Sequence, residues 1–269
     1  EMRRFVEPQS ITAVGVSRRT GPQSFNLLEN LLQYGYAGRI YPVNPNASEI
    51  LGVKTYSGVV DVPEVTDVAL ISLPRDMVVR AVADCLHKGI KAVVIITQGF
   101  ADADDETGPR LQRQLVEMAR KTGARILGPN TFGVANAHLK MSTSYISIPM
   151  EVNGIGTISQ TGGTFIGLND IRLVGKVVDI GDACDVDAVD CLEYFEQDAE
   201  TKVVVLHVEG MPDARRFLSA VRRVALKKPV VALKTGRSEQ SARAVQSHTG
   251  ALTGSDLLWD LALRQAGAS

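Results

Sequence analysis

Hydrophobic runs and amphipathic segments alternate along the first half of the chain. Short apolar runs rich in β-branched residues predict strands at residues 10–15, 39–43, 68–73, 92–97 and 125–127. Hydrophobic positions at helical spacing predict helices between them, at residues 23–33, 77–87 and 106–121. Gly89 predicts a glycine C-cap just after Lys88. This alternation predicts a parallel sheet with right-handed crossovers and helices on both faces, the nucleotide-binding type of doubly wound domain.

The second half repeats the alternation. Its patterns predict strands at residues 154–159, 176–179, 202–208 and 229–233, and helices at residues 187–195, 214–226 and 251–266. The segment 136–153 is polar and irregular, so we expect no regular element there. Gly128-Pro129-Asn130 ends the first sheet, and we therefore expect two domains, residues 1–130 and 131–269. Element spacing suits a flavodoxin-like second domain with a parallel sheet, although spacing does not fix the strand order.

Composition agrees with two globular domains. The chain has 269 residues, of which 45% are hydrophobic and 22% charged, so it is long enough for two cores. Its net charge of -1 gives no electrostatic reason to expect nucleic acid or a membrane as a partner. Cys85, Cys184 and Cys191 lack metal-ligand spacing, so we expect reduced, buried thiols. Since there is also no membrane-length apolar stretch or signal-peptide core, we expect a cytoplasmic protein.

Polar or glycine-bearing turns follow the predicted strands of the first half. Ligands of open parallel sheets bind beyond the carboxyl ends of the strands, where these turns lie. The loop 15–21 after the first strand offers backbone N–H groups for a pyrophosphate, and Arg18 and Arg19 add positive charge. Ser72-Leu73-Pro74 and Thr97-Gln98-Gly99 follow the third and fourth strands. Each turn alone is ordinary, but their alignment along one edge predicts a ligand cleft.

The loop after the first strand departs from the dinucleotide fingerprint. Ser17 replaces a glycine of the GxGxxG pattern, and the next glycine is Gly21. The second strand ends in Val43-Asn44-Pro45, without the acidic residue that holds an NAD ribose. An NAD-dependent dehydrogenase is therefore disfavoured. The chain also lacks a GxxxxGK[ST] P-loop.

The second half offers candidates for phosphoryl chemistry. Ser159-Gln160-Thr161-Gly162-Gly163 stands at a strand end, where small residues let the backbone close on an anion. His248 precedes a predicted helix and has the position of a nucleophile, although a histidine hydrogen-bonded within its loop is the alternative. Glu209 follows the strand 202–208 and is its natural partner, since a carboxylate would fix the imidazole tautomer. The alternative for Glu209 is a solvated loop carboxylate.

Other titratable residues give weaker signals. Asp182, Asp185 and Asp187 lack the glycine and terminal glutamate of a calcium loop, so we expect no metal site and assign Asp185 to helix capping. His87, His138 and His207 show no ligand spacing and receive no chemical role.

Seven short motifs occur in a characteristic order. They are Gly15-Val16-Ser17, Tyr41-Pro42-Val43-Asn44-Pro45, Gly128-Pro129-Asn130, Ser159-Gln160-Thr161-Gly162-Gly163, Val208-Glu209-Gly210, Lys234-Thr235-Gly236-Arg237-Ser238 and Ser247-His248-Thr249-Gly250. Together they span essentially the whole chain and resemble the NDP-forming acyl-CoA synthetases. That family includes ADP-forming acetyl-CoA synthetase and, more distantly, the α subunit of succinyl-CoA synthetase.

The resemblance implies a CoA-binding Rossmann-like domain followed by a flavodoxin-like ligase domain. The implied coenzyme A site comprises Gly15, Ser17, Arg18, Val43, Asn44, Pro45, Ser72, Pro74, Thr97 and Gln98. The implied phosphate site comprises Ser159, Gln160, Thr161, Gly162, Gly163, Thr249 and Gly250. His248 would be the phosphohistidine and Glu209 its orienting carboxylate. The implied chemistry runs from acyl-CoA through acyl phosphate and phosphohistidine to ATP, or in reverse.

The resemblance also implies partners. Family members continue into an ATP-grasp module, so we expect Mg-ATP or ADP to bind only through an ATP-grasp subunit or domain, and we expect an oligomer. The segment between Gly163 and Gly181 is about one helical turn, roughly four residues, shorter than the family leads us to expect. A non-catalytic CoA-binding regulatory domain is the alternative function. The acyl group is not specified by the sequence, but we expect selectivity to depend on residues 136–150 and 161–165.

Overall fold

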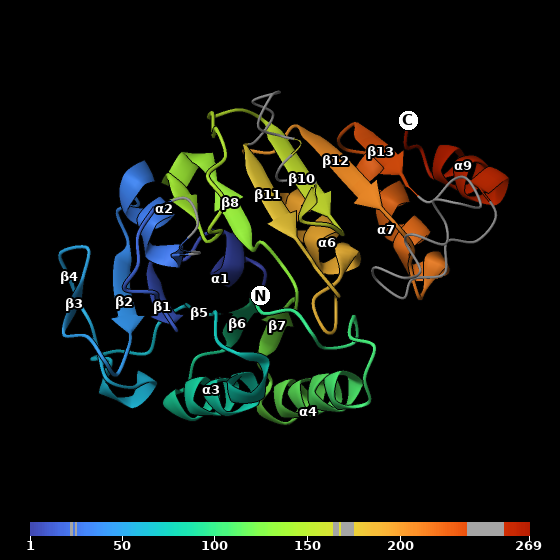
Figure 1. The fold of residues 1–269 in the computed structure, drawn as a ribbon. Coiled ribbons are helices and arrows are strands. Elements are labelled where there is room, and N and C mark those ends of the chain that lie inside the picture. The colour runs from blue at the N-terminus through green and yellow to red at the C-terminus, as the bar shows by residue number, and fades with distance from the viewer. Residues whose placement is uncertain (22–23, 25, 164–166, 168–174, 236–255) are drawn as a thin grey trace.

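The first half of the chain forms a five-stranded parallel sheet in the order β2-β1-β5-β6-β7. The computed structural model describes residues 1–269 except 22–23, 25, 164–166, 168–174 and 236–255 (Figure 1). The strands are β1 (Ser10–Val14), β2 (Arg39–Val43), β5 (Val68–Ile71), β6 (Ala92–Ile95) and β7 (Arg125–Leu127). All residues of β1, β5 and β6 are buried, as in a sheet covered on both faces.

Helices cover both faces of this sheet. Helices α3 (Arg75–Lys88) and α4 (Thr107–Thr122) run side by side along one face, whereas α1 (Arg3–Val6) and α2 (Leu27–Tyr34) lie on the other side (Figure 1). The strands therefore send alternate residues into different cores: Leu70 packs with the α1 and α2 residues, and Ile71 with those of α3 and α4.

Helix ends follow local chemistry. Gly89 has a left-handed φ of 100° and ends α3 after Lys88, which confirms the predicted glycine cap. Asn26 caps α2 by accepting a hydrogen bond from the Leu28 N–H, so the helix begins at Leu27 rather than at residue 23. Between β2 and β5 the chain adds a hairpin and a single turn that the sequence patterns do not predict. These elements are β3 (Glu49–Ile50), β4 (Val53–Lys54) and η1 (Val59–Asp61).

The second half forms a six-stranded sheet in the order β13-β12-β10-β11-β8-β9. Its parallel part comprises β10 (Ile155–Ser159), β11 (Lys176–Asp179), β12 (Val203–Val208) and β13 (Val230–Lys234). The helices of this half that the structure describes are α6 (Ala188–Gln197), α7 (Ala214–Ala225) and α9 (Asp256–Gln265). The predicted α/β fold with a parallel sheet in each half is therefore confirmed, and the second sheet has an antiparallel edge in addition.

The antiparallel edge corrects one prediction. Strand β8 (Val134–Asn136) pairs antiparallel with β11, and β9 (Met141–Ser142) pairs with β8, joined by the turn η2 (Ala137–Leu139). The segment 136–153 was expected to be irregular, yet Ser142, Thr143 and Ser144 are buried. Small polar residues occupy these positions because they satisfy the backbone: Thr143 Oγ1 accepts from the Val134 N–H at 2.8 Å.

Both sheets have the same internal order. In each, the first parallel strand is central, with the second strand on one side and the third on the other. From the first strand the chain crosses to the strand on one side, and from there it crosses back to the strand on the other side. This reversal creates a switch point beside β1 and another beside β10. Among the described residues, the predicted loops after β1, β2, β5 and β10 lie at these switch points, and the loop after β6 follows one strand further along the first sheet.

Two cations connect the halves, the buried Lys176 and the half-buried Arg125. Lys176 is 1% exposed, and its Nζ lies 2.7 Å from Glu200 Oε2, 2.9 Å from Asp198 Oδ2 and 3.4 Å from Glu7 Oε1. Burial alone lowers the pKa of Lys176, but hydrogen bonds to Glu200 and Asp198 raise it above its ordinary value. Arg125 of β7 makes a second connection, with Asp185 at 3.1 Å and Asp190 at 2.9 Å.

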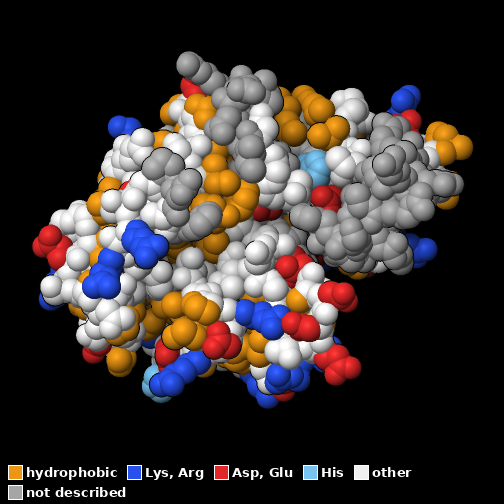
Figure 2. All heavy atoms as spheres, viewed as in Figure 1, with side chains coloured by type: hydrophobic (Ala, Val, Ile, Leu, Met, Phe, Trp, Pro, Cys, Tyr) orange, Lys and Arg blue, Asp and Glu red, His pale blue; other side chains and the backbone are white. Residues whose placement is uncertain are grey.

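The surface of the described residues carries both signs of charge. Figure 2 shows basic and acidic side chains on the same face, consistent with the net charge of -1. Among the described residues, no helix has the length and the apolar character needed to span a bilayer.

Substitution of Lys176 by Met should strongly destabilise the protein. It removes the cation and leaves the buried Asp198 carboxylate without its ion pair, which costs about 3–5 kcal/mol. Urea unfolding followed by circular dichroism measures the change. Lys121→Met is the matched control, because the Lys121–Glu117 pair is exposed and contributes well under about 1 kcal/mol. Equal losses in the two variants would contradict a stabilising role for the buried network.

Candidate functional site

At the first switch point, the loops after β1, β2 and β5 meet. Gly15 has a φ of +85°, and a Cβ at this position would collide with the Ser72 carbonyl oxygen, so only glycine lets the two loops approach. The Gly15 N–H donates to the Val43 carbonyl at 3.2 Å. The Asn44 side-chain amide donates to the Val16 carbonyl at 2.9 Å. The predicted coenzyme A residues at these three strand ends are thus brought together.

The loop after β6 joins this edge. Thr97 Oγ1 donates to the Leu73 carbonyl at 2.7 Å, which ties the loops after β5 and β6 to each other. Gln98 and Pro74 are exposed, as are Arg18 and Pro45 further along the edge. Ser17 is half-buried, and its Oγ accepts from the Arg19 N–H at 3.0 Å.

At the second switch point, Gln160 connects the loops after β10 and β12. Its Oε1 accepts from the backbone N–H groups of Glu209, at 2.6 Å, and Gly210, at 3.1 Å. Its Nε2 donates to the Gly210 carbonyl at 2.8 Å. The side chain that the sequence assigned to phosphate is thus engaged with the protein backbone, where it positions Glu209.

Hydroxyl groups shape the rest of this loop. Ser159 Oγ accepts from the Thr161 N–H at 3.2 Å and donates to the Thr161 carbonyl at 2.8 Å. Thr161 Oγ1 accepts from the Gly163 N–H at 3.3 Å. The loop is therefore folded by its own side chains into a compact turn after β10.

A cavity of about 640 Å³ extends from the loops after β5 and β6 to the loop after β10. From the first half it is lined by predicted residues Ser72, Pro74, Thr97 and Gln98, and from the second by Gln160, Thr161, Gly162 and Gly163. The other predicted residues of the described chain lie outside its lining: Gly15, Ser17, Arg18, Val43, Asn44, Pro45, Ser159 and Glu209. One cavity thus reaches both loop sets, and we take it as the candidate active site.

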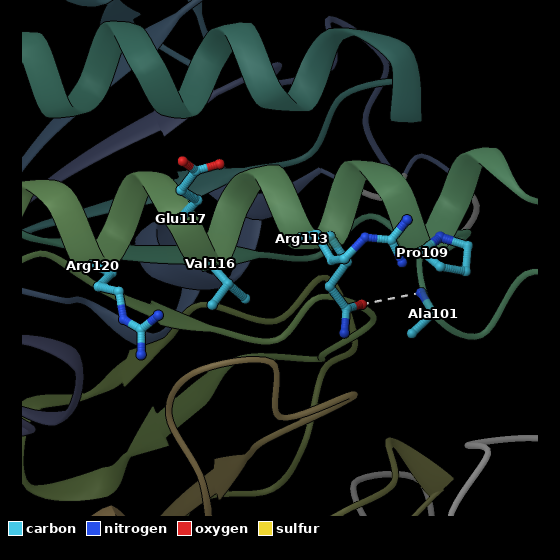
Figure 3. A pocket seen from close by; sticks show the side chains of 7 residues that line it. Ala101, Pro109, Arg113, Val116, Glu117 and Arg120 are labelled. Carbon is cyan, nitrogen blue, oxygen red and sulfur yellow. Dashed lines mark hydrogen bonds between the residues drawn. The ribbon is translucent and has the colours of Figure 1, made fainter.

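A separate pocket of about 400 Å³ lies along α4 (Figure 3). Its wall is one helix face with Arg113, Val116 and Arg120, and the Ala101 N–H donates to Gln112 Oε1 at its edge. It contains none of the predicted site residues, so we assign it no part in the chemistry.

The cavity also contains residues that were not among the predicted site residues, although Tyr145 belongs to the segment 136–150 that was expected to govern acyl selectivity. They come from the junction between the halves and are Asn130, Thr131, Phe132, Tyr145, Gly181 and Asp182. Gly181 is needed there because a Cβ would collide with the Pro129 carbonyl. The Asn130 N–H donates to the Thr97 carbonyl at 3.0 Å, and the Asp182 N–H to the Pro129 carbonyl at 2.9 Å. The Gly128-Pro129-Asn130 motif was the available signal: it was interpreted as a domain boundary and as one of the family motifs, but it was not assigned to the ligand site.

Two buried carboxylates border the junction. Burial raises the pKa of Asp182 to about 7, and the neighbouring Asp102 carboxylate raises it further. Among the described residues, Asp182 Oδ2 has no hydrogen-bond partner, whereas Oδ1 accepts from the Asn130 amide at 3.3 Å. Burial also raises the pKa of Asp179 to about 7, although the N–H groups of Phe132 and Gly181 donate to it.

The structure reassigns the neighbouring aspartates. Asp187, not Asp185, caps α6, because its Oδ1 accepts from the Val189 and Asp190 N–H groups. Asp185 instead accepts from the Ile126 N–H at 2.7 Å and pairs with Arg125. Within the described ranges, no group of His, Cys, Asp and Glu side chains has a metal-binding arrangement.

The predicted nucleophile lies outside the described residues. This applies to His248, Thr249 and Gly250, and to most of the segment between Gly163 and Gly181 that was expected to be short. Glu209 is described and is 6% exposed, which excludes the alternative of a solvated loop carboxylate. It lies at the end of β12, next to the loop that Gln160 holds.

Comparison with known protein families identifies both halves. The family model described as a CoA binding domain matches residues 9–137, and the one described as a succinyl-CoA ligase like flavodoxin domain matches residues 153–269. The α subunit of acetate–CoA ligase [ADP-forming] I from Pyrococcus furiosus is 38% identical over 97% of this chain. Acetate–CoA ligase [ADP-forming] from Methanocaldococcus jannaschii is 36% identical over 99% of it.

A solved structure extends the similarity to three dimensions. The dinucleotide forming acetyl-coenzyme A synthetase 1 of Ca. Korarchaeum cryptofilum, in complex with phosphate and ADP, superposes with a TM-score of 0.89 at 35% identity. That match covers 100% of this chain and 59% of the other. The chain spans 58% of the Pyrococcus furiosus subunit and 38% of the Methanocaldococcus jannaschii protein.

Replacing Gln160 by Ala should loosen the connection between the two loops. The buried N–H groups of Glu209 and Gly210 lose their acceptor, which costs about 1–3 kcal/mol. Hydrogen exchange at these two amides should accelerate, and urea unfolding should give the loss of stability. Gln160→Met separates lost packing from lost hydrogen bonds, and exposed Gln114→Ala is the control. Unchanged exchange at residues 209 and 210 would exclude the proposed connection.

Replacing Asp182 by Asn should make the protein less sensitive to pH. A folded-state pKa of about 7, raised from 3.8, means that the folded protein binds more protons than the unfolded chain between these values. Stability therefore falls as pH rises through this range. Asp182→Asn should gain about 1–3 kcal/mol over the parent at pH 8 and much less at pH 4. The urea unfolding midpoints of parent and variant at pH 4 and pH 8 measure the gain in stability, and exposed Asp104→Asn is the control. An equal gain at the two pH values would contradict the raised pKa of Asp182.

Proposed function

Because the chain belongs to the NDP-forming acyl-CoA synthetase family, we propose that it is the CoA-binding and phosphohistidine-bearing part of an ADP-forming acyl-CoA synthetase. The overall reaction converts acyl-CoA, phosphate and ADP into a carboxylic acid, coenzyme A and ATP. The observation that carries the proposal is the cavity of about 640 Å³, which joins the predicted coenzyme A edge to the predicted phosphate loop.

Coenzyme A fits the first switch point. Gly15 keeps the loop after β1 against Ser72, at the edge where the ligand would lie, and the exposed Arg18 supplies charge for its phosphates. Ser72, Pro74, Thr97 and Gln98 line the cavity toward the second half and are suited to the end of the cofactor that carries the thioester. We assign Ser17, Val43, Asn44 and Pro45 to the outer part of the same site.

Phosphate belongs at the turn after β10, with Ser159, Thr161, Gly162 and Gly163, and with Thr249 and Gly250. In the first step, a phosphate oxygen attacks the acyl carbon, the C–O bond forms, the C–S bond breaks and the thiol of coenzyme A leaves. In the second, a His248 ring nitrogen attacks phosphorus and the carboxylate leaves. Glu209 orients the imidazole and stabilises its positive charge. Gln160 acts through Glu209 and positions it.

The remaining parts of the proposal concern organisation. We place the domain boundary between residues 130 and 131, since β7 ends at Leu127 and β8 begins the second sheet at Val134. The Pyrococcus furiosus relative is named a subunit alpha, which supports a partner for this chain. We propose that an ATP-grasp subunit or domain binds Mg-ATP or ADP, and that the assembly is an oligomeric cytoplasmic enzyme.

The function predicts a phosphoprotein that depends on one histidine. Incubation with acetyl-CoA and labelled phosphate, or with ATP and the ATP-grasp partner, should label the chain with an acid-labile, base-stable phosphate. His248→Asn should abolish labelling, and Glu209→Gln should slow it at least tenfold because the imidazole loses its orienting carboxylate. His87→Asn, at an exposed position of α3, is the matched control.

Two outcomes would overturn the proposal. Labelling of His248→Asn at the parent's rate would place the nucleophile elsewhere. Tight acyl-CoA binding in calorimetry, without any phosphoryl transfer in the presence of a competent partner, would instead identify a regulatory CoA-binding domain.

A further inference from the structure

We propose that Phe132 and Tyr145 form the wall that limits the size of the acyl group in the active site. This inference rests on the proposed function and adds the residues that select the substrate. It concerns a short stretch of the cavity lining, where the first half, the second half and the junction between them meet.

The two aromatic rings form one packed unit. Their centroids lie 5.3 Å apart with an interplanar angle of 78°, an edge-to-face contact. Both side chains are partly exposed and both line the cavity, so their rings are accessible to a bound molecule. Leu73 and Ile96 line the same cavity from the first half, so an apolar group would find apolar contacts from both halves.

The position of Phe132 is fixed by the phosphate loop. A Cβ on Gly162 would collide with the Phe132 ring, so the ring lies directly on the loop and the glycine leaves room for it. The Phe132 N–H donates to the buried Asp179 carboxylate at 2.7 Å, and this bond fixes the backbone from which the ring extends. The ring therefore has little freedom to move away from a substrate.

The position of Tyr145 is fixed from the other half of the molecule. The side-chain amide of Asn30, a buried residue of α2, donates to the carbonyls of Ser144, at 2.6 Å, and Ile146, at 2.9 Å. These two residues flank Tyr145 in the chain. The aromatic pair is thus anchored to both halves.

Reaction geometry places the acyl group at this wall. The carbonyl carbon must lie between the thiol that leaves and the phosphate oxygen that attacks, so it lies next to the loop 160–163. Phe132 packs on Gly162 of that loop. The substituent on the carbonyl carbon must then extend along the aromatic pair, and the space beside the rings selects a small acyl group.

Rates with a panel of thioesters test this assignment. The complete enzyme with its ATP-grasp part is assayed with acetyl-, butyryl-, isobutyryl- and phenylacetyl-CoA. Phe132→Ala should raise the ratio of kcat/KM for the larger thioesters to that for acetyl-CoA at least tenfold, since one methylene group in an apolar pocket already changes it by about tenfold or more. Tyr145→Ala should change the ratio in the same direction, and Phe132→Leu should give an intermediate ratio with less risk to folding.

Matched controls separate selectivity from general damage. Tyr41→Ala removes one ring of the edge-to-face Tyr41–Tyr56 pair, which lies outside the cavity lining, and should leave the ratio unchanged. Calorimetry should show that Phe132→Ala and Phe132→Leu bind free coenzyme A within about twofold of the parent, because the wall contacts the acyl part alone.

The outcomes distinguish this inference from the proposed function. If the parent forms no phosphoprotein with any thioester, the function itself fails. If the parent reacts, but Phe132→Ala and Phe132→Leu lose rate equally on all four thioesters, the rings do not select the acyl group and this inference alone is overturned.

Discussion

The backbone hydrogen bonds between the segments 126–133 and 179–186 hold the active site together. Four N–H groups of the second segment donate to carbonyls of the first: Asp179 to Gly133, Asp182 to Pro129, Cys184 to Gly128 and Val186 to Ile126, at 2.9–3.1 Å. They join the last strand of one sheet to the chain that leaves β11 in the other. Together with the hydrophobic core that the halves share, they hold the loops after β5 and β6 beside the loop after β10, where one cavity contains residues of all three.

Charged groups at this junction stabilise it through ion pairs, but two of its carboxyl groups also lower the stability of the folded protein. Lys176 pairs with Glu7 and Arg125 pairs with Asp190 across it, but Asp179 and Asp182 also lie in it, and burial raises the pKa of each carboxyl group to about 7. Removing a carboxylate from water is unfavourable, so these two positions reduce the stability of the folded protein at neutral pH. Asp179 offsets part of this cost by ordering the loop beside Phe132. Such a local loss of stability is typical of a functional site.

Periodicity predicted most of the fold, because strands buried on both faces are short continuous apolar runs. The bounds of β2, β7 and β11 agree with the prediction, but β8 and β9 were missed, since strands of two or three residues that mix apolar and polar side chains carry no periodic signal. The residues of the candidate site also fall into a group that the sequence predicted and a group that it did not. Loop residues at strand ends were visible in the sequence, whereas Phe132 and Asp182 reach the cavity only through contacts between distant segments. Such contacts depend on tertiary packing that one sequence does not reveal.

The location of the aromatic wall has a consequence for catalysis. The body of coenzyme A is assigned to the edge of the first sheet, far along the chain from Phe132, while the ring contacts the loop assigned to phosphate. Under the proposed function, contacts with the acyl substituent would therefore form where bonds break. Contacts that strengthen as carbonyl carbon and phosphate approach would stabilise the transition state more than the bound substrate. A wall at this junction would then discriminate between acyl groups in the chemical step, while affinity for the common cofactor would stay with the first half.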